Sequence, residues 1–282
     1  MAGGRAKSGK LNPLPGRRPA PGDSMRILQL SDPHLLADPA GLCRGRPPAA
    51  MLRRALRCAL EQADAAGGPP DLLLISGDLC HDESWGGYVR LRELLEAEPL
   101  AADLPLALLA GNHEQPALLR AVWRRRAQLA PALLRLGGWR LLLLDSHWAG
   151  RVAGRLGERQ LRWIAGILRD GEAPLLVALH HPPVAIGDPL FDAIGLADGP
   201  ELLSLLGDAA AVRGVLFGHV HQHWQGSLPG RPELPLLACP STLSAFAAVQ
   251  RCPLGRPDDP GGRLLDLGDD GSLRQRLLRW CA

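Results

Sequence analysis

Aromatic side chains make up only 4% of the 282-residue chain, and its apolar runs are all short. None approaches the roughly 18 residues that a membrane-spanning helix needs, so the sequence predicts no transmembrane segment and no membrane partner. The amino-terminal end also lacks the apolar stretch of a signal peptide. A hydrophobic fraction of 46% in a chain of this length instead predicts one large globular domain, or at most two.

Cysteine pairs of the Cys-x-x-Cys type are absent, and the six cysteines have no regular spacing. A disulfide framework is not expected in a chain of this length that lacks an export signal. We therefore expect six reduced thiols in a cytoplasmic protein. The six are Cys43, Cys58, Cys80, Cys239, Cys252 and Cys281.

Lysine is absent after Lys10, so arginine carries all the positive charge of the remaining chain. Residues 1–24 contain five basic residues and one acidic residue, a net charge of +4, which leaves −1 for the rest of a chain whose total is +3. The body is therefore close to neutral. It offers no basic surplus for nucleic acid, and we expect no nucleic-acid partner.

The first 24 residues are rich in glycine, proline and basic side chains. This composition does not support an apolar core, so the sequence predicts a disordered basic tail at residues 1–24 and a single domain at residues 25–282. Met25 stands directly before the first apolar run. We hypothesise that translation starts at Met25 rather than at Met1.

Short apolar runs alternate with amphipathic stretches, which is the pattern of an α/β layered fold. Helices are predicted at residues 47–66, 84–96, 116–129, 157–169 and 200–206. Strands are predicted at residues 26–30, 71–75, 105–109, 139–144, 174–179 and 212–217. Two hairpins follow, at residues 223–239 and 262–280, and the second turns at residues 268–271.

Polar motifs follow five of these strands. They are Ser31-Asp32-Pro33-His34, Ser76-Gly77-Asp78, Gly111-Asn112-His113-Glu114, His180-His181 and Gly218-His219-Val220-His221. The carboxyl ends of strands in a wound α/β sheet lie along one edge, so we expect the five loops to meet in one crevice.

Two carboxylates, an amide oxygen and several imidazoles would then lie together. This mixture of oxygen and nitrogen donors suits divalent manganese, iron, cobalt or zinc. Asp78 has two carboxylate oxygens and can bridge two cations. Two such cations can acidify a shared water and stabilise the attacking and leaving oxygens of a phosphoryl transfer.

Each motif alone has a simpler structural explanation. Asp-x-His and Gly-Asp are common in turns, Asn-His-Glu can begin a helix, and Gly-His-x-His can be an exposed strand end. The ordered set, with each motif placed after a predicted strand, favours a metal site over these separate explanations.

The order of the motifs resembles that of the calcineurin-like metallophosphoesterase superfamily, from Met25 to about residue 245. Residues 26–32, 142–146, 180–183 and 240–242 look like the bacterial class III cyclic-AMP phosphodiesterases. The resemblance implies a four-layer αββα sandwich of two mixed β-sheets flanked by helices. It also implies two divalent metal ions, iron or manganese before zinc or cobalt, and hydrolysis of 3′,5′-cyclic AMP to 5′-AMP by a hydroxide that bridges them.

The resemblance further implies seven metal ligands. The first ion would be held by Asp32, His34 and His221, the second by Asn112, His180 and His219, and Asp78 would bridge the two.

His113 is the catalytic residue that the resemblance implies. It would face the substrate phosphate and donate a hydrogen bond or a proton to the leaving oxygen. Asn112, His113 and His221 would contact the substrate.

Four further histidines match no ligand position. His223 is expected at the rim of the site or directly behind the ligands, and His181 at the end of its strand. His81 and His147 are expected at the entrance.

Two residues depart from the family pattern. Pro33 stands in the middle of the first motif, and Glu114 stands where aspartate is more common in the subfamily. Glu114 matches the serine/threonine protein phosphatases of the superfamily, but their Asp-Arg-Gly is replaced here by Asp78 followed by Leu-Cys-His-Asp. This difference argues against a phosphoprotein substrate.

Three functions are open at this point. The first is a metal-dependent hydrolase of cyclic nucleotides, the second is a phosphodiesterase that acts on glycerophosphodiesters or other nucleotides, and the third is a metal-stabilised module that senses a nucleotide without cleaving it. All implied ligands and His113 are present, which favours an enzyme with a small-molecule phosphodiester substrate. A body charge near −1 disfavours a nuclease.

Overall fold

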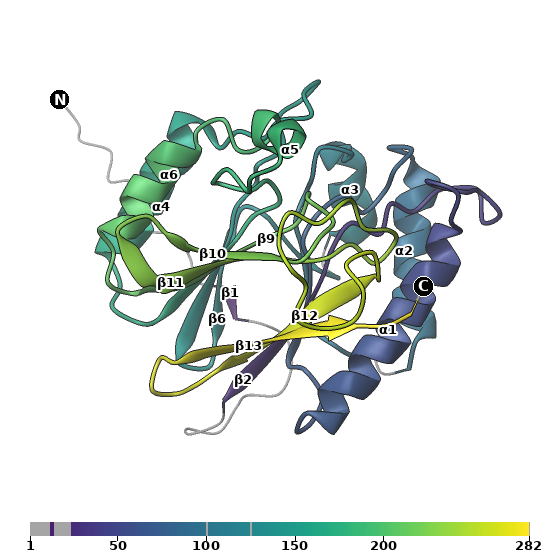
Figure 1. The fold of residues 1–282 in the computed structure, drawn as a ribbon, viewed down its shortest axis with the longest axis horizontal. Helices are drawn as coiled ribbons and strands as arrows, with labels where there is room; N and C mark the ends of the chain where they lie inside the picture. The colour runs from purple at the N-terminus through teal and green to yellow at the C-terminus, as the bar shows by residue number, and fades with distance from the viewer. Residues whose placement is uncertain (1–11, 14–23, 100, 125, 282) are drawn as a thin grey trace.

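The computed structural model describes residues 12–13, 24–99, 101–124 and 126–281 (Figure 1). Two β-sheets lie in the middle of the molecule, and helices cover their outer faces. This arrangement confirms the four-layer αββα sandwich, in which each sheet buries one face against the other sheet and one face under helices.

The first sheet has six strands in the order β13-β12-β2-β3-β4-β5. They are β2 (Met25–Leu30), β3 (Leu72–Ile75), β4 (Leu106–Leu108), β5 (Gln128–Leu129), β12 (Gly261–Leu267) and β13 (Leu273–Arg279). Strands β2 to β5 run parallel, and β12 pairs antiparallel with both β2 and β13. Its outer face is covered by α1 (Pro48–Ala65), α2 (Trp85–Ala97) and α3 (Pro116–Trp123).

The second sheet has seven strands in the order β1-β6-β7-β8-β9-β11-β10. They are β1 (Asn12–Pro13), β6 (Ala132–Leu136), β7 (Trp139–Leu143), β8 (Leu175–Ala178), β9 (Val212–Phe217), β10 (Trp224–Leu228) and β11 (Arg231–Ala238). Strands β7, β8 and β9 are parallel neighbours. The outer face is covered by α4 (Gly157–Arg169) and α6 (Gly199–Gly207), while the short α5 (Pro189–Ala193) lies in the segment that follows β8.

The central strands are apolar on both sides because both sides are buried. Ile27 packs in the apolar cluster between the sheets, whereas its neighbour Leu28 packs in the cluster under the helices. Leu74 and Leu73 of β3 divide in the same way. This alternation explains why the strand sequences read as continuous apolar runs.

The helix predicted over residues 116–129 is wrong in its second half. Helix α3 ends at Trp123, where Arg124 takes a positive φ of 27°. Gln128 and Leu129 instead pair with β4 at the sheet edge, so that tertiary pairing decides their conformation. Strand β6 and helix α5 were not predicted.

The predicted disordered tail falls mostly on residues 1–11 and 14–23, which lie outside the described residues. Asn12 and Pro13, which are described, pair in parallel with β6. Among the described helices, none is both long and apolar enough to cross a membrane. The six cysteines form no disulfide in the described structure.

Candidate metal centre

Four predicted ligands form a first buried group. Asp32 and His34 follow β2, Asp78 follows β3 and His221 follows β9, and their ligand atoms all lie within 4.8 Å of one another. The Nε2 atom of His221 is 3.3 Å from Oδ1 of Asp32 and 3.0 Å from Nε2 of His34. Loops from both sheets therefore supply one cluster of nitrogen and oxygen donors.

The other three predicted ligands are His180 after β8, His219 after β9 and Asn112 after β4. Nδ1 of His219 lies 3.3 Å from Nε2 of His180. The Oδ1 atom of Asn112 is buried and has no hydrogen-bond partner in the described part of the chain. A buried oxygen without a partner is unfavourable, and a cation bound beside it would satisfy it.

Asp78 faces both sets of histidines. Its Oδ2 atom lies 3.7 Å from Nε2 of His34, and its Oδ1 atom lies 3.4 Å from Nε2 of His180. One carboxylate thus presents one oxygen to each side. Together with the unpartnered Asn112 oxygen, this arrangement fits a pair of divalent cations.

The carboxylates are held in the ionised form that a cation requires. Burial raises the pKa of Asp78, but the charge and hydrogen bond of His180 outweigh burial and hold the pKa well below its usual range. For Asp32, burial is outweighed by His221, and the pKa is again lowered. Burial lowers the pKa of His34, and it lowers that of His219 to about 3, so both imidazoles are neutral.

His180 differs from the other ligand histidines. Burial lowers its pKa, but the Asp78 carboxylate more than reverses this effect and raises the pKa to about 9. The metal-free protein therefore holds a proton on His180 at neutral pH. A cation that binds His180 replaces that proton.

Backbone carbonyls fix the orientation of two ligand rings. Nδ1 of His180 lies 2.8 Å from the carbonyl oxygen of Ser76, and Nδ1 of His221 lies 2.9 Å from that of Ser244. A proton on Nδ1 in each ring donates to the carbonyl and leaves Nε2 free to bind a cation. These carbonyl groups have no sequence signal.

Five proposed ligands have left-handed backbone conformations, which non-glycine residues rarely adopt. They are Asp32, His34, Asp78, His219 and His221, with φ between 47° and 68°. The loops also pack closely against one another at Gly111, where a Cβ atom would collide with Asp78 and with His180. The glycine is required by the close approach of the two ligands.

Glu114 ties the loops after β3 and β4 together. Its carboxylate accepts hydrogen bonds from the amides of Asp78, Leu79 and Cys80, and from that of Gly111. Burial and the Asp78 charge raise the pKa of Glu114 to about 8, against the effect of these donors. The sequence marked Glu114 only as a departure from the subfamily, and its role in positioning Asp78 was missed.

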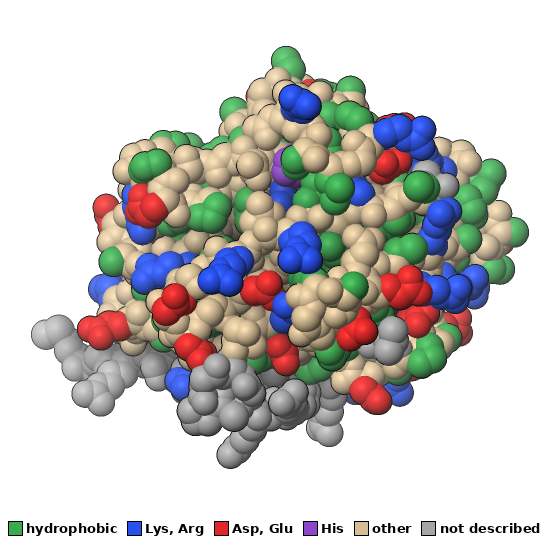
Figure 2. Space-filling model, turned by 60° about the horizontal axis from the view of Figure 1, so that its bottom comes forward, with side chains coloured by type: hydrophobic (Ala, Val, Ile, Leu, Met, Phe, Trp, Pro, Cys, Tyr) green, Lys and Arg blue, Asp and Glu red, His purple; other side chains and the backbone are tan. Residues whose placement is uncertain are grey.

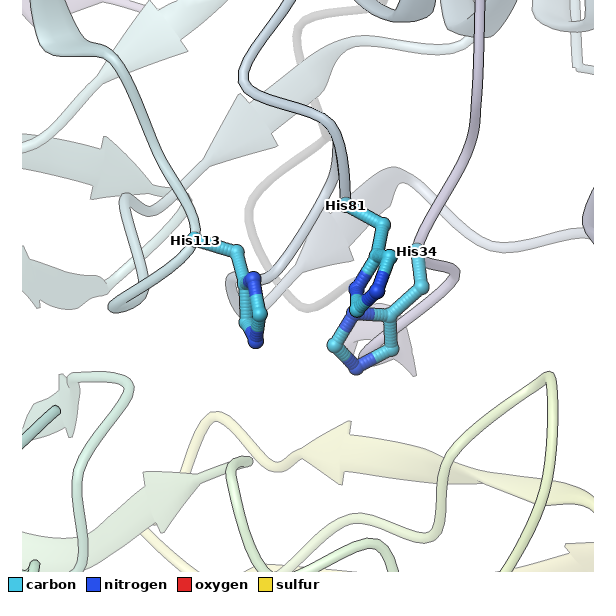
Figure 3. Close-up of side chains that lie close together, drawn as sticks. All are labelled: His34, His81 and His113. Carbon is cyan, nitrogen blue, oxygen red and sulfur yellow. The ribbon is translucent and has the colours of Figure 1, made fainter. Parts of the chain in front are cut away.

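His113 stands beside the first group without belonging to it. Its backbone amide donates to Oδ1 of Asp78 at 3.0 Å, and its half-buried ring lies 5.1 Å from that of His34 and 4.7 Å from that of His81. Figure 3 shows the three rings projecting from three separate loops into the same space. His113 is therefore placed to face a molecule bound at the cluster.

His181, His147 and His81 have other partners. His181 contacts the Ser146 hydroxyl through Nδ1 at 2.8 Å and the Val152 carbonyl through Nε2 at 3.0 Å, so neither nitrogen is free for a cation. His147 donates from Nδ1 to the Gly111 carbonyl at 2.9 Å. His81 lies 3.3 Å from His34, Nδ1 to Nδ1, and is half-buried.

Of the two places expected for His223, the structure excludes the exposed rim of the site. The residue is only 4% exposed, and its Nδ1 accepts a hydrogen bond of 3.0 Å from the buried guanidinium of Arg263. Arg263 also donates to the carbonyls of Ala238 and Trp224. His223 is buried because it pairs with this arginine between the hairpins.

Arg44 and Phe246 lie next to the first group and were not predicted as site residues. The Arg44 guanidinium stacks on the Phe246 ring at 4.2 Å, and its Nη1 is 3.2 Å from Nδ1 of His221.

Figure 2 shows a small area of histidine surface beside hydrophobic side chains. Acidic and basic side chains are mixed over the described part of that face, without a continuous basic track.

Comparison with protein families gives a match over residues 25–223 to the model described as calcineurin-like phosphoesterase. The chain is also 51% identical over 263 residues to a probable cyclic nucleotide phosphodiesterase of Synechococcus sp. (strain WH7803), covering 91% of this chain and 97% of the relative. It is 37% identical over 270 residues to the 3′,5′-cyclic adenosine monophosphate phosphodiesterase CpdA of Pseudomonas aeruginosa, covering 93% and 92%.

Two solved structures share the fold. One is the purple acid phosphatase PPD1 of yellow lupin (Lupinus luteus), with a TM-score of 0.68 and 14% identity, matched over 92% of this chain and 52% of that chain. The other is a dimetal phosphatase of Danio rerio, with a TM-score of 0.58 and 14% identity, matched over 91% and 99%.

Proposed function

Because this chain belongs to the calcineurin-like phosphoesterase family, we propose that it hydrolyses 3′,5′-cyclic AMP to 5′-AMP. The observation that carries the proposal is the position of Asp78, whose two carboxylate oxygens face His34 and His180 separately. The printed names of the Synechococcus and Pseudomonas relatives support a cyclic nucleotide as substrate.

Two divalent cations, when bound, would supply a bridging hydroxide as the nucleophile and neutralise the charge of the phosphate. In this proposal they are held by the seven predicted ligands, and iron or manganese is favoured over zinc or cobalt. Asn112 and His221 lie beside the bound phosphate as well. The first ion would be held by Asp32, His34 and His221, the second by Asn112, His180 and His219, and Asp78 would be shared.

His113 acts on the leaving group. Attack on phosphorus forms one phosphorus–oxygen bond and breaks the bond to the ribose 3′-oxygen, which leaves as a strongly basic alkoxide unless it receives a proton. The half-buried His113 ring lies next to His34 and points into the same space, so it can deliver that proton. The hydrogen bond that its backbone amide donates to Asp78 fixes the His113 backbone relative to the cluster.

The proposed substrate is a small molecule rather than a polynucleotide. The chain from residue 25 has a net charge near −1, and the face in Figure 2 mixes both signs of charge. Polynucleotide binding normally needs many basic contacts along a track.

A hydrolysis panel tests the proposal. The protein is stripped of metals, reloaded with manganese, and given cyclic AMP, cyclic GMP, bis(p-nitrophenyl) phosphate and glycerophosphodiesters, with products separated by chromatography. We expect 5′-AMP from cyclic AMP and loss of turnover in chelator. Faster turnover of glycerophosphodiesters would indicate a broader phosphodiesterase, and no turnover of any substrate would indicate a binding module.

A further inference from the structure

Arg44 lies at the tip of a tight turn beside the metal cluster. The amide and carbonyl groups of Cys43 and Arg46 bond to each other, and the two residues between them, Arg44 and Gly45, have φ values of 54° and 73°. Positive φ at both central positions is typical of a type I′ turn, in which glycine or asparagine is favoured. An arginine there is strained, and such strain persists most often where the side chain has a function.

The turn is anchored to the loop that carries Phe246. Cys43 is buried in a small apolar cluster with Met51 and Leu243. Leu243 stands three residues before Phe246, so the cluster fixes the Arg44 turn and the Phe246 loop relative to each other. The stacked pair is thus held in place from both sides.

The Arg44 guanidinium is held close to the cluster, and its contact there is a hydrogen bond only when Nδ1 of His221 carries no proton. Its Nη1 lies 3.2 Å from Nδ1 of His221, whose other neighbour is the Ser244 carbonyl at 2.9 Å. When Nε2 of His221 is free for a cation, Nδ1 carries a proton and donates to Ser244. Arginine carries only donors, so it cannot bond to that protonated nitrogen.

Arg44 also lacks a charged partner. Arg44 is exposed, and within the described residues no carboxylate forms an ion pair with its guanidinium. The Phe246 ring holds the guanidinium by a cation–π contact without using any of its N–H groups. Its donors are therefore available to an anionic ligand.

We propose that Arg44 is a substrate-binding residue that donates to a non-bridging phosphate oxygen of the phosphodiester, with Phe246 as the platform that orients it. The inference rests on the proposed function, because it places a phosphate at the cluster. A guanidinium matches a phosphate in both charge and geometry, since its N–H groups form a planar fork. Phosphate is favoured over the nucleobase as its partner because Arg44 contacts His221, a proposed ligand of the cluster where the phosphate sits.

The decisive variant is Arg44→Gly. Glycine accepts the left-handed backbone, so the thermal unfolding midpoint should not fall, whereas a purely structural arginine would lower it on removal. We expect inorganic phosphate and 5′-AMP to bind the manganese-loaded variant roughly 10- to 100-fold more weakly by calorimetry, as for the loss of a hydrogen bond to a charged group. Arg44→Lys should recover part of the affinity, because it keeps the charge but loses the fork.

Arg46→Ala is the matched control, since it removes a positive charge from the same turn two residues away. It should bind both ligands as the parent does, and metal content should be the same in all variants. Unchanged phosphate affinity in Arg44→Gly would overturn the inference, as would an equal loss in Arg46→Ala. Weaker binding of 5′-AMP with unchanged binding of phosphate would overturn it in favour of a base contact.

The inference and the proposed function fail separately. A parent protein that binds phosphate through Arg44 but does not hydrolyse cyclic AMP would refute the substrate and leave the Arg44 contact intact. A parent that hydrolyses cyclic AMP with the same KM as Arg44→Gly would refute the contact alone.

Discussion

The Glu114 carboxylate accepts a hydrogen bond from the backbone amide of Asp78, with nitrogen and oxygen 2.9 Å apart. It also accepts one from the amide of Gly111. One buried side chain therefore joins the loop that carries the proposed bridging ligand to the loop that carries Asn112 and His113. The geometry of the cluster therefore depends on a residue that is not itself a proposed metal ligand.

Replacing Glu114 by Gln is expected to weaken both the fold and the cluster. The glutamine amide would place N–H donors against backbone N–H donors, leaving buried groups unpaired at a cost of about 1–3 kcal/mol. Urea unfolding of the metal-free protein at pH 9, above the pKa of about 8 where Glu114 is ionised, should show this loss, and metal titration should show weaker binding. Glu83→Gln, a change in the exposed loop before α2, should alter neither quantity.

His113→Ala tests the proposed role in leaving-group departure. The alanine variant keeps the backbone amide that donates to Asp78, so both metals should remain. Cyclic AMP turnover should fall by the order of 10²- to 10⁴-fold typical of general acid catalysis. Hydrolysis of bis(p-nitrophenyl) phosphate should fall distinctly less, because p-nitrophenolate leaves without a proton. Equal losses on the two substrates would indicate phosphate positioning instead.

His223→Ala should destabilise the protein without removing a metal. The change leaves one N–H of the buried Arg263 without an acceptor, which costs about 1–3 kcal/mol. His223→Asn is the matched variant, since its side-chain oxygen can accept from Arg263 and should restore part of the loss. Unfolding midpoints and metal counts on both proteins check the assignment, which fails if either loses a metal.

The metal-free protein should be most stable near pH 6.5. Burial lowers the pKa of five histidines from 6.5, so below that pH the unfolded chain binds more protons than the folded one, and each contributes a loss of up to about 1.4 kcal/mol per pH unit. The five are His34, His81, His181, His219 and His223.

His180 and Glu114 have the opposite sign. The pKa of His180 is raised to about 9 and that of Glu114 to about 8, so the stability that each contributes is lost as pH rises towards those values. Urea midpoints measured in chelator at pH 5.5, 6.5, 7.5 and 9 check the prediction. A midpoint that rises steadily from pH 6.5 to 9 would contradict it.

The sequence predicted those parts of the fold whose pattern is set by burial. Strands β2, β3, β8 and β9 were placed to within two residues, because runs buried on both faces are continuously apolar. Residues 128–129 were misassigned because their conformation is set by pairing with β4. The local sequence around them carries no sign of that contact. Strand β6 and helix α5 lacked a clear local signal.

The convergence of the five polar loops was predicted from strand order, and the structure brings them together at the ends of strands from two sheets rather than one. The residues that support the cluster were not predictable in the same way. Glu114 acts through backbone amides and Ser244 through its carbonyl, neither of which has a residue-type signature. Arg44 became a candidate only when its turn and its contact with Phe246 were known.

The metal content of Asp78→Asn tests the central claim most directly. Asparagine keeps an oxygen that can accept from the His113 amide but removes the negative charge that both cations would share. Asp82→Asn is the control, because it removes an exposed carboxylate from the same loop. Elemental analysis after manganese loading should find fewer than two ions in Asp78→Asn, with near-complete loss of cyclic AMP hydrolysis, and two ions in Asp82→Asn. Two ions and parental activity in Asp78→Asn would contradict the account.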